Sequence, residues 1–395
     1  DCRLMSVPLA TGWGSAGLES GTYLLKNVKS GRYLGPGNEW GTQASLLPVT
    51  HGEVLTLGSA VYTINSQATG YFTGSYMDGA AKGMGILKNS SNQYAIFHNG
   101  SYFGYDGSTS VLKALPELTD DALWEIIPVE DALAGATKAN PADATFLIND
   151  ANFDRNARYF DSWKLTGGTT SYAGKGGDNV NLNWQKWNGV FDFNQTVSNL
   201  PNGLYMMKAQ GFYRPGKNTD VSVEQSAILY AGDVKKPMSL VSSPKIAIRD
   251  DAKGFTTENK NEGDYYVPNS QGDASKAFSA GYYEHVLDEI LVENATLKIG
   301  AKNDATTGDQ WAVIDNFRLY YYGPTVSSGA KELPAEALEA GKWYYFDINI
   351  EGVYDLELTS LDDIVYTQDA SILLEDANTI TSKFAKKDEL SLTEG

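Results

Sequence analysis

Apolar and polar residues alternate with a period of two along several stretches in the second half of the chain. The alternation covers residues 190–197, 203–214, 226–232, 295–302 and 312–322. Such a period places one face of an extended segment on a core and the other on solvent, as in half-buried β-strands. We therefore predict two facing antiparallel sheets in this region.

One segment departs from this alternation and predicts a short helix. Residues 271–280 follow Ser270, and either Ser270 or Asp273 could cap the helix before Gly281. Elsewhere the high content of Gly (40), Tyr (24) and Trp (8) favours short strands and tight turns. Aromatic side chains suit pleated surfaces, and glycine tolerates positive φ. The predicted fold class is all-β.

A strand, a polar turn and a second strand carrying an aromatic residue recur three times near the N-terminus. The copies occupy residues 21–35, 60–74 and 92–104. One unit has nothing to pack against, whereas three units closing around an axis bury their apolar residues and leave few open edges. Five further strands are predicted at residues 44–49, 53–58, 83–88, 110–115 and 122–129. Together they predict a closed, threefold barrel of eleven strands.

This region resembles the β-trefoil of ricin-type lectins. The resemblance spans roughly residues 15–130 and implies a β-trefoil-like domain at residues 1–131. The matching residues are Asn27, Ser30, Gly31, Tyr33, Leu34, Trp124 and Ile126.

The stretch around Trp40 is similar to one found in surface proteins of gut Bacteroidetes. Trp40 is a candidate platform for a sugar ring, since an exposed aromatic face can stack on the C–H face of a pyranose. The alternative, a tryptophan that packs a loop, has equal weight.

Residues 132–143 are rich in Ala, Gly and Pro and predict a linker. The region that follows, residues 144–323, resembles jelly-roll carbohydrate-binding modules of the galactose-binding-like kind. Such modules open with a strand that runs into a motif matched here by residues 150–154, followed by Trp163. A Leu-Pro-x-Gly turn at residues 200–203 and an Asp-Asn pair in the last strand follow in the expected order.

The same resemblance implies a structural calcium ion between the first loop and the last strand. Asp154 and Asp315 correspond to its ligands, and Asp150 or a nearby carbonyl would assist. Hard oxygen ligands from distant segments let one cation tie together two ends of a sandwich. In the alternative, Asp315 accepts backbone hydrogen bonds at a strand end without a metal.

Candidate ligand contacts are aromatic rings and an arginine, because sugar sites use ring stacking and forked hydrogen bonds. Trp184 and Trp187 are three residues apart and cannot share one strand face, so at least one belongs to the core. For each candidate, a structural role is the alternative. The candidates are Trp184, Trp187, Tyr213, Arg214, Tyr265 and Tyr266.

The remaining segment, residues 324–395, predicts a linker followed by a small β domain or the front part of a larger one. Its aromatic cluster at residues 343–346 suits a core or an interface. Cys2 is the one cysteine, which excludes an intramolecular disulfide and a cysteine-based zinc site. It is a chance thiol or the remnant of a lipid anchor.

The net charge of −18, without a basic patch, argues against nucleic acid as a partner. No apolar run approaches the roughly 18 residues of a membrane-spanning helix. The three histidines are scattered and show no metal-binding spacing. Carboxylates are numerous enough for a glycosidase, but neither resembled fold normally supplies the deep cleft that a catalytic pair needs.

We therefore expect a protein without catalytic activity that is secreted or attached to a bacterial cell surface. It would bind carbohydrate or glycoprotein, as an adhesin or a nutrient-capture protein. Two alternatives stay open: a structural scaffold, and an accessory region of a larger cell-surface glycoside hydrolase. The sequence does not determine the glycan or the oligomeric state.

Overall fold

The computed structural model describes residues 11–37, 41–48, 53–58, 62–154, 162–178, 181–216, 226–243, 246–247, 260–261, 265–305 and 309–324. Within these residues the chain is nearly all β, as predicted. Cys2, Trp40 and the predicted C-terminal region from residue 325 onward lie outside them. No helix in the described residues is long and apolar enough to cross a membrane.

The described strands of the N-terminal region form one 11-stranded sheet. Its main path is β1-β7-β8-β11-β2-β3-β4; β5 pairs with β2 and β6, and β9 pairs with β8 and β10. The strands are β1 (Trp13–Ser15), β2 (Gly21–Asn27), β3 (Tyr33–Gly37), β4 (Gln43–Leu47), β5 (Leu55–Leu57), β6 (Ile64–Ser66), β7 (Gly85–Asn89), β8 (Tyr94–His98), β9 (Ser101–Gly104), β10 (Lys113–Leu115) and β11 (Trp124–Pro128).

Two residues that carry the lectin resemblance make buried hydrogen bonds in this region. Trp124 is fully buried and donates its indole N–H to the carbonyl of Phe103 (2.8 Å). Asn27, also fully buried, donates to the carbonyls of Asp121 (2.9 Å) and Leu123 (3.2 Å). A buried polar side chain needs such partners, so the motif is explained by folding. The threefold closure of a trefoil stays a prediction.

One predicted strand of this region is wrong and one was missed. Residues 71–74 form only isolated bridges from Tyr71 to Asn65 and Gly79. Gly70 and Gly74 flank this stretch with φ of 144° and 111°, which interrupts an extended ladder. Strand β1 was not predicted, since its three residues are too few to show a period.

The second region is a sandwich of two sheets. One has the order β14-β15-β26-β17-β20, with β12 on β26 and β24 on β17; the other has the order β13-β16-β25-β18-β19. A small third sheet has the order β21-β23-β22. The strands are β12 (Ala142–Asp143), β13 (Lys164–Gly167), β14 (Ala173–Gly177), β15 (Leu182–Trp187), β16 (Phe191–Ser198), β17 (Gly203–Arg214), β18 (Ala227–Ala231), β19 (Val234–Pro237), β20 (Ser239–Leu240), β21 (Ile246–Ala247), β22 (Lys260–Asn261), β23 (Tyr265–Tyr266), β24 (Glu284–Val292), β25 (Thr296–Asn303) and β26 (Trp311–Gly323).

The predicted pair of facing sheets is confirmed by the core between them. Trp184 of β15 stacks on Phe193 of β16 with ring centroids 4.0 Å apart and an interplanar angle of 4°. Buried residues of both sheets, such as Met207, Leu229 and Ile299, join the same cluster. Alternate residues of each strand therefore face the core, as their period predicts.

The opening strand that was expected to run into the motif at residues 150–154 is not formed. Thr145–Leu147 is a 3₁₀ turn that follows the two-residue strand β12. Phe146, Leu147 and Ile148 are all buried, and consecutive residues of a strand on the core could not all point inward. The Thr145 hydroxyl accepts a hydrogen bond from the backbone N–H of Leu319 (2.9 Å), which fixes the turn on β26.

Strand β26 contains a bulge at the predicted Asp-Asn pair. Opposite β17, the register shifts between the pairs Lys208–Arg318 and Gln210–Asp315. Asn316 has φ of 53°, a left-handed conformation that asparagine tolerates better than most residues. The Asn316 side chain donates to Gln210 (2.7 Å) and so holds the bulge against β17.

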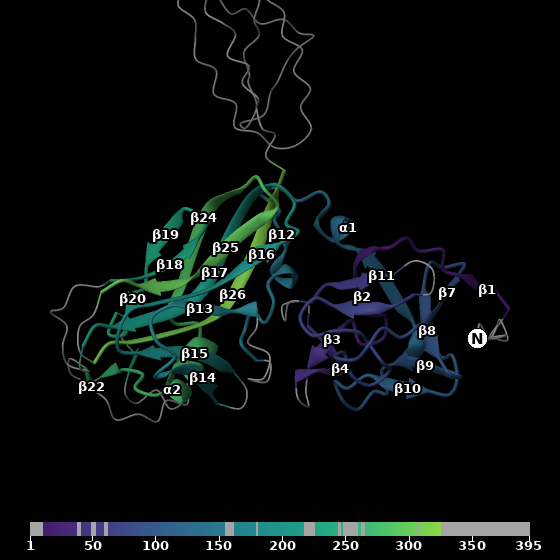
Figure 1. Ribbon diagram of the computed structural model, residues 1–395, viewed down its shortest axis with the longest axis horizontal. Coiled ribbons are helices and arrows are strands. Elements are labelled where there is room, and N and C mark those ends of the chain that lie inside the picture. Colours follow the sequence, from purple (N-terminus) through teal and green to yellow (C-terminus); the bar gives the residue numbers. More distant parts are fainter. Residues whose placement is uncertain are drawn as a thin grey trace, which may run out of the picture.

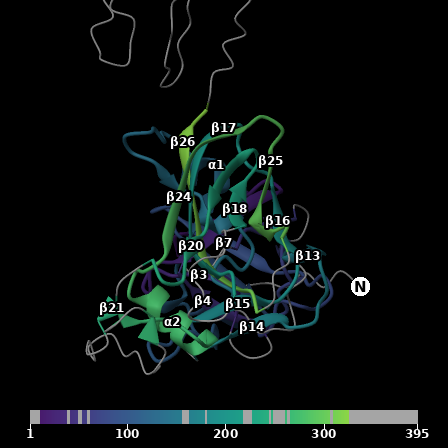
Figure 2. The ribbon, with the colours of Figure 1, turned by 90° about the vertical axis from the view of Figure 1, so that its left-hand side faces the viewer.

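The predicted helix is α2 (Gln271–Ser279), and Ser270 is its cap. The Ser270 side chain accepts a hydrogen bond from the backbone N–H of Asp273. Helix α2 packs across β14, β15 and β26 (Figure 2). It covers the outer face of the larger sandwich sheet, where Phe278 and Phe212 share a small core.

Helix α1 (Val129–Leu133) lies between the two regions (Figure 1). Val129 and Leu133 belong to one buried cluster with Leu24 of β2 and Ala144 beside β12. The predicted linker, residues 132–143, thus includes the end of α1 and the strand β12. The domain boundaries themselves stay a prediction.

Candidate functional site

Three neighbouring strands place a row of side chains at one end of the larger sandwich sheet. Trp187 ends β15, Trp311 begins β26 and Arg214 ends β17. The register pairs Trp187 with Trp311 and Trp311 with Arg214. Directly paired residues project from the same face of a sheet, so the three side chains form one row. We call it the Trp–Arg row.

The row is held by stacking. The rings of Trp187 and Trp311 are stacked with centroids 5.3 Å apart. The guanidinium carbon of Arg214 lies 4.7 Å from the Trp187 centroid and 5.2 Å from that of Trp311, and this side chain also donates to Asn269 (2.7 Å). Burial lowers the pKa of Arg214 from its usual value, and the aromatic faces partly compensate the cost of burying this cation.

Gln185 fixes the indole orientations. Its side-chain oxygen accepts hydrogen bonds from the indole N–H of Trp187 (3.1 Å) and of Trp311 (2.9 Å). Neither ring can rotate without breaking one of these bonds. The row is therefore a pre-organised aromatic surface.

The row becomes more exposed toward the sheet edge. Trp311 is fully buried, Arg214 is 4% exposed and Trp187 is half-buried. Beyond Trp187 lies Tyr172, which is 74% exposed and whose carbonyl accepts the backbone N–H of Trp187 (3.0 Å). The accessible part of the site therefore lies at Trp187 and Tyr172.

Open space adjoins Trp187 on strand β14. Gly174 is paired with Gln185, and a Cβ atom added at Gly174 would meet nothing within 4 Å. One step further, a Cβ at Gly176 would lie 2.4 Å from the Gln271 side-chain oxygen. The Gln271 amide also donates to the Gly174 carbonyl (3.3 Å). A shallow surface at Gly174 is thus bordered by Trp187 on one side and by α2 on the other.

Two of the predicted ligand contacts are core residues. Trp184 is 3% exposed and stacks on Phe193 between the sheets. Tyr213 is 1% exposed, and its hydroxyl bonds to Ser226 (3.1 Å) and Gln310 (2.8 Å). Both project to the face opposite the Trp–Arg row, because Trp184 directly precedes Gln185 and Tyr213 directly precedes Arg214, and consecutive residues of a strand point to opposite faces. We therefore withdraw them as ligand contacts.

The other predicted contacts have different outcomes. Trp187 and Arg214 meet in the Trp–Arg row, although Arg214 is buried. Tyr265 and Tyr266 form β23, but their side chains, like Trp40, lie outside the described residues. Sequence reasoning missed Tyr172, which stands in a Gly-Thr-Ser loop without alternation. It also missed Gly174, because the open space beside this residue exists only in the folded chain.

The predicted calcium ligands lie around a buried lysine. The Lys175 ammonium contacts the Asp150 carboxylate (3.2 Å), and the two side chains are only 4% and 6% exposed. Asp154 accepts the backbone N–H of Leu182 (3.0 Å). Burial raises the pKa of Asp154, and the charge of Asp150 adds to this effect while Lys175 opposes it.

Asp315 is fully buried beside the same group. Burial raises the pKa of Asp315 well above its usual range; the charges of Asp154 and Asp150 raise it further, and Arg318 opposes them. Asp315 lies inside β26 and not at a strand end, and it accepts the backbone N–H of Asn316 (2.7 Å). Among the described residues, no group of three or more His, Cys, Asp or Glu side chains could hold a metal ion.

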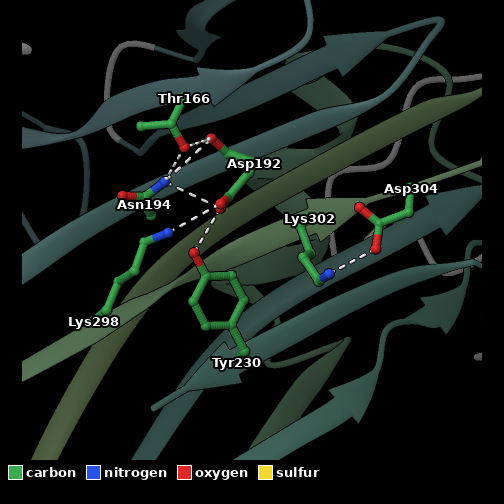
Figure 3. Close-up of polar contacts among 7 residues, drawn as sticks. All are labelled: Thr166, Asp192, Asn194, Tyr230, Lys298, Lys302 and Asp304. Carbon is green, nitrogen blue, oxygen red and sulfur yellow. Dashed lines mark hydrogen bonds and ion pairs between the residues drawn. The ribbon is translucent and has the colours of Figure 1, made fainter. Parts of the chain in front are cut away.

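The outer face of the other sandwich sheet carries a polar network centred on Asp192 (Figure 3). Asp192 accepts hydrogen bonds from Tyr230, Asn194 (3.0 Å) and Lys298 (3.0 Å). Burial alone would raise the pKa of Asp192, but these hydrogen bonds outweigh it and lower the pKa below its usual value. Each partner comes from β16, β18 or β25, so the network joins three strands.

The described histidines are engaged with the backbone. His98 Nδ1 lies 2.9 Å from the carbonyl of Gly83, and His285 Nε2 lies 2.9 Å from that of Gly211. They belong to different sheets. This placement gives neither of them the setting of a general base beside a nucleophile.

Neither a protein family nor a curated protein is detectably similar to this chain in sequence. Several solved structures are similar to parts of this chain. A ricin B-like lectin from Macrolepiota procera, in complex with lactose, is 16% identical with a TM-score of 0.26, covering 28% of this chain and 97% of its own. The carbohydrate-binding module TmCBM27, studied for mannan recognition, is 14% identical with a TM-score of 0.25, covering 43% and 94%. TmCBM61, in complex with β-1,4-galactotriose, is 16% identical with a TM-score of 0.22, covering 41% and 90%.

Proposed function

We propose that this chain is a non-catalytic glycan-binding protein and that a sugar ring stacks on Trp187 above Gly174. The observation that carries the proposal is a half-buried indole, fixed by Trp311, Arg214 and Gln185, beside open space on the sheet. A flat aromatic surface with neighbouring amides suits the apolar face and the hydroxyls of a pyranose.

The chemistry around Trp187 supports binding without cleavage. Tyr172 supplies a second exposed ring, and Gln271 supplies an amide at the border of the Gly174 surface. The carboxylates described above lie elsewhere: Asp150, Asp154 and Asp315 lie around Lys175, and Asp192 is in its own network with Lys298. We further propose that the protein acts outside the cell or on its surface, where glycans are met.

The test is binding to soluble polysaccharides in affinity gels and to a glycan array. Trp187→Ala should weaken binding about 30-fold or more, because a central aromatic contact contributes on the order of 2 kcal/mol. Gly174→Val should weaken binding similarly while folding normally, since the added atoms enter open space and a β-branched residue suits a strand.

Leu291→Ala is the matched control, because Leu291 is a large apolar side chain that is 51% exposed on β24. This variant should bind like the wild type. Full binding by both Trp187→Ala and Gly174→Val would contradict the site. Failure of the wild type to bind any glycan would favour the scaffold alternative.

A further inference from the structure

The loop at residues 148–154, where a calcium ion was expected to tie the first loop to the last strand, is hydrogen-bonded to both sandwich sheets. The Asn149 N–H donates to the Gln195 side chain (2.9 Å) on β16, and Gln195 donates back to the Asn149 carbonyl (2.8 Å). On the other sheet, the Phe317 N–H at the β26 bulge donates to the Ala151 carbonyl (2.9 Å).

Strand β14 contributes a cation to this loop. Lys175 is paired with Trp184, whose side chain faces the core, so Lys175 also points inward from its edge strand. Its ammonium lies 3.2 Å from the Asp150 carboxylate, and water is largely excluded from both groups. A buried ion pair persists only with close geometry and further hydrogen bonds.

Two cations of the chain, Lys175 and Arg318, lie at this loop. Lys175 faces Asp150, and Arg318 donates to Asn152 in the same loop and to the carbonyl of Phe317 (2.7 Å). Calcium requires six to eight oxygen ligands at about 2.3–2.6 Å. An ammonium bonded to one of the expected ligands repels such an ion and fills its surroundings, so the residues present do not fit calcium.

We propose that the Lys175 ammonium is a built-in cation that takes the place of calcium, and that the sandwich folds independently of calcium. Lys175 ties the edge strand β14 to the loop at residues 148–154 through Asp150. The sequence supplies the cation permanently, whereas a metal would be lost at low calcium concentration.

The experiment measures the thermal midpoint of the full chain in EGTA and in millimolar calcium chloride. The wild-type midpoint should be the same in both. Lys175→Met, which keeps most of the side-chain volume and removes the charge, should lower the midpoint by roughly 6–20 °C, as expected for breaking a buried pair. Lys208→Met is the matched control: its pair with Glu284 is 33% and 50% exposed, so the midpoint should fall by less than about 2 °C.

A second variant tests whether calcium can bind once the Lys175 ammonium is removed. Lys175→Ala removes the ammonium and leaves space among Asp150, Asp154 and Asp315, so calcium should raise its midpoint. A calcium-dependent rise in the wild type that Asp154→Asn abolishes would overturn the proposal. So would an unchanged midpoint in Lys175→Met. Should Lys175→Met fail to fold, the EGTA comparison on the wild type and on Lys175→Arg, which keeps the charge, decides the question.

Discussion

Charged side chains in the sandwich are stabilised by partners of different kinds. Arg214 lies against two indole rings, Lys175 against one carboxylate, and Asp192 among a hydroxyl, an amide and an ammonium. A buried charge costs several kcal/mol unless such groups replace its water. Each of the three therefore fixes the strands that carry its partners.

The Asp192 network predicts a pH dependence of stability. Because the pKa of Asp192 is lower in the folded chain than its usual value, its contribution is present above about pH 4 and is lost as pH falls through the folded-state pKa. Asp192→Asn should reduce the free energy of unfolding by about 1 kcal/mol between pH 5 and 7. The difference from the wild type should shrink toward pH 3, as measured by urea unfolding.

Asp304→Asn is the control for this prediction, because the pair of Asp304 with Lys302 (Figure 3) is more exposed. It should change stability little at any of these pH values. A deficit of Asp192→Asn that is the same at pH 3 and pH 7 would contradict the assigned role.

At the scale of elements, strands with a long alternating pattern were predicted well. The predicted bounds of β17, residues 203–214, agree with the structure, and those of β16, β18, β25 and β26 differ from the structure by one residue at each end. The wrong predictions occur where contacts between distant segments, and not the local pattern of apolar residues, determine the structure. The turn at Thr145–Leu147 is an apolar run that its docking on β26 folds into a 3₁₀ turn.

The candidate site was predicted only in part, for a similar reason. Residue type identified Trp187 and Arg214, whereas Trp184 and Tyr213 have the same chemistry and differ only in the face they occupy. The period of two shows that the faces differ, but not which face a core covers. Lys175 was missed because a lysine on an edge strand normally points to solvent.

Helix α2 depends on its cap. Ser270→Ala should lower the free energy of unfolding by about 1 kcal/mol, since the Asp273 N–H would lose its acceptor (3.1 Å). Chemical denaturation measures the change. Ser279→Ala, at the exposed end of the same helix, should be nearly neutral. Equal effects of the two substitutions would show that the cap is unimportant.

At the scale of the whole molecule, α1 couples the N-terminal sheet to the sandwich. Leu133 is 2% exposed and shares a buried cluster with Leu24 of β2 and Leu319 of β26. A buried apolar cluster thus connects the two regions of this acidic chain. Loss of packing in this cluster should therefore destabilise both the N-terminal sheet and the sandwich.

Leu133→Ala should destabilise the chain by about 2–4 kcal/mol, the usual cost of a cavity at a buried leucine. Hydrogen exchange followed by mass spectrometry should show faster exchange in both β2 and β12. Leu112→Ala is the control, because Leu112 belongs to a cluster confined to the N-terminal sheet. That variant should leave β12 unchanged. Faster exchange on one side only in Leu133→Ala would disprove the coupling.

The bulge at Asn316 sets the phase of strand β26. Before it the inward residues have even numbers, Ala312 and Ile314; after it they have odd numbers, Phe317 and Leu319. The bulge at Asn316 therefore exchanges the set of alternate residues that faces the core along β26. Deleting Asn316 would turn the second half of the strand inside out, so evolution can remove or add a residue here only together with a compensating change elsewhere in β26.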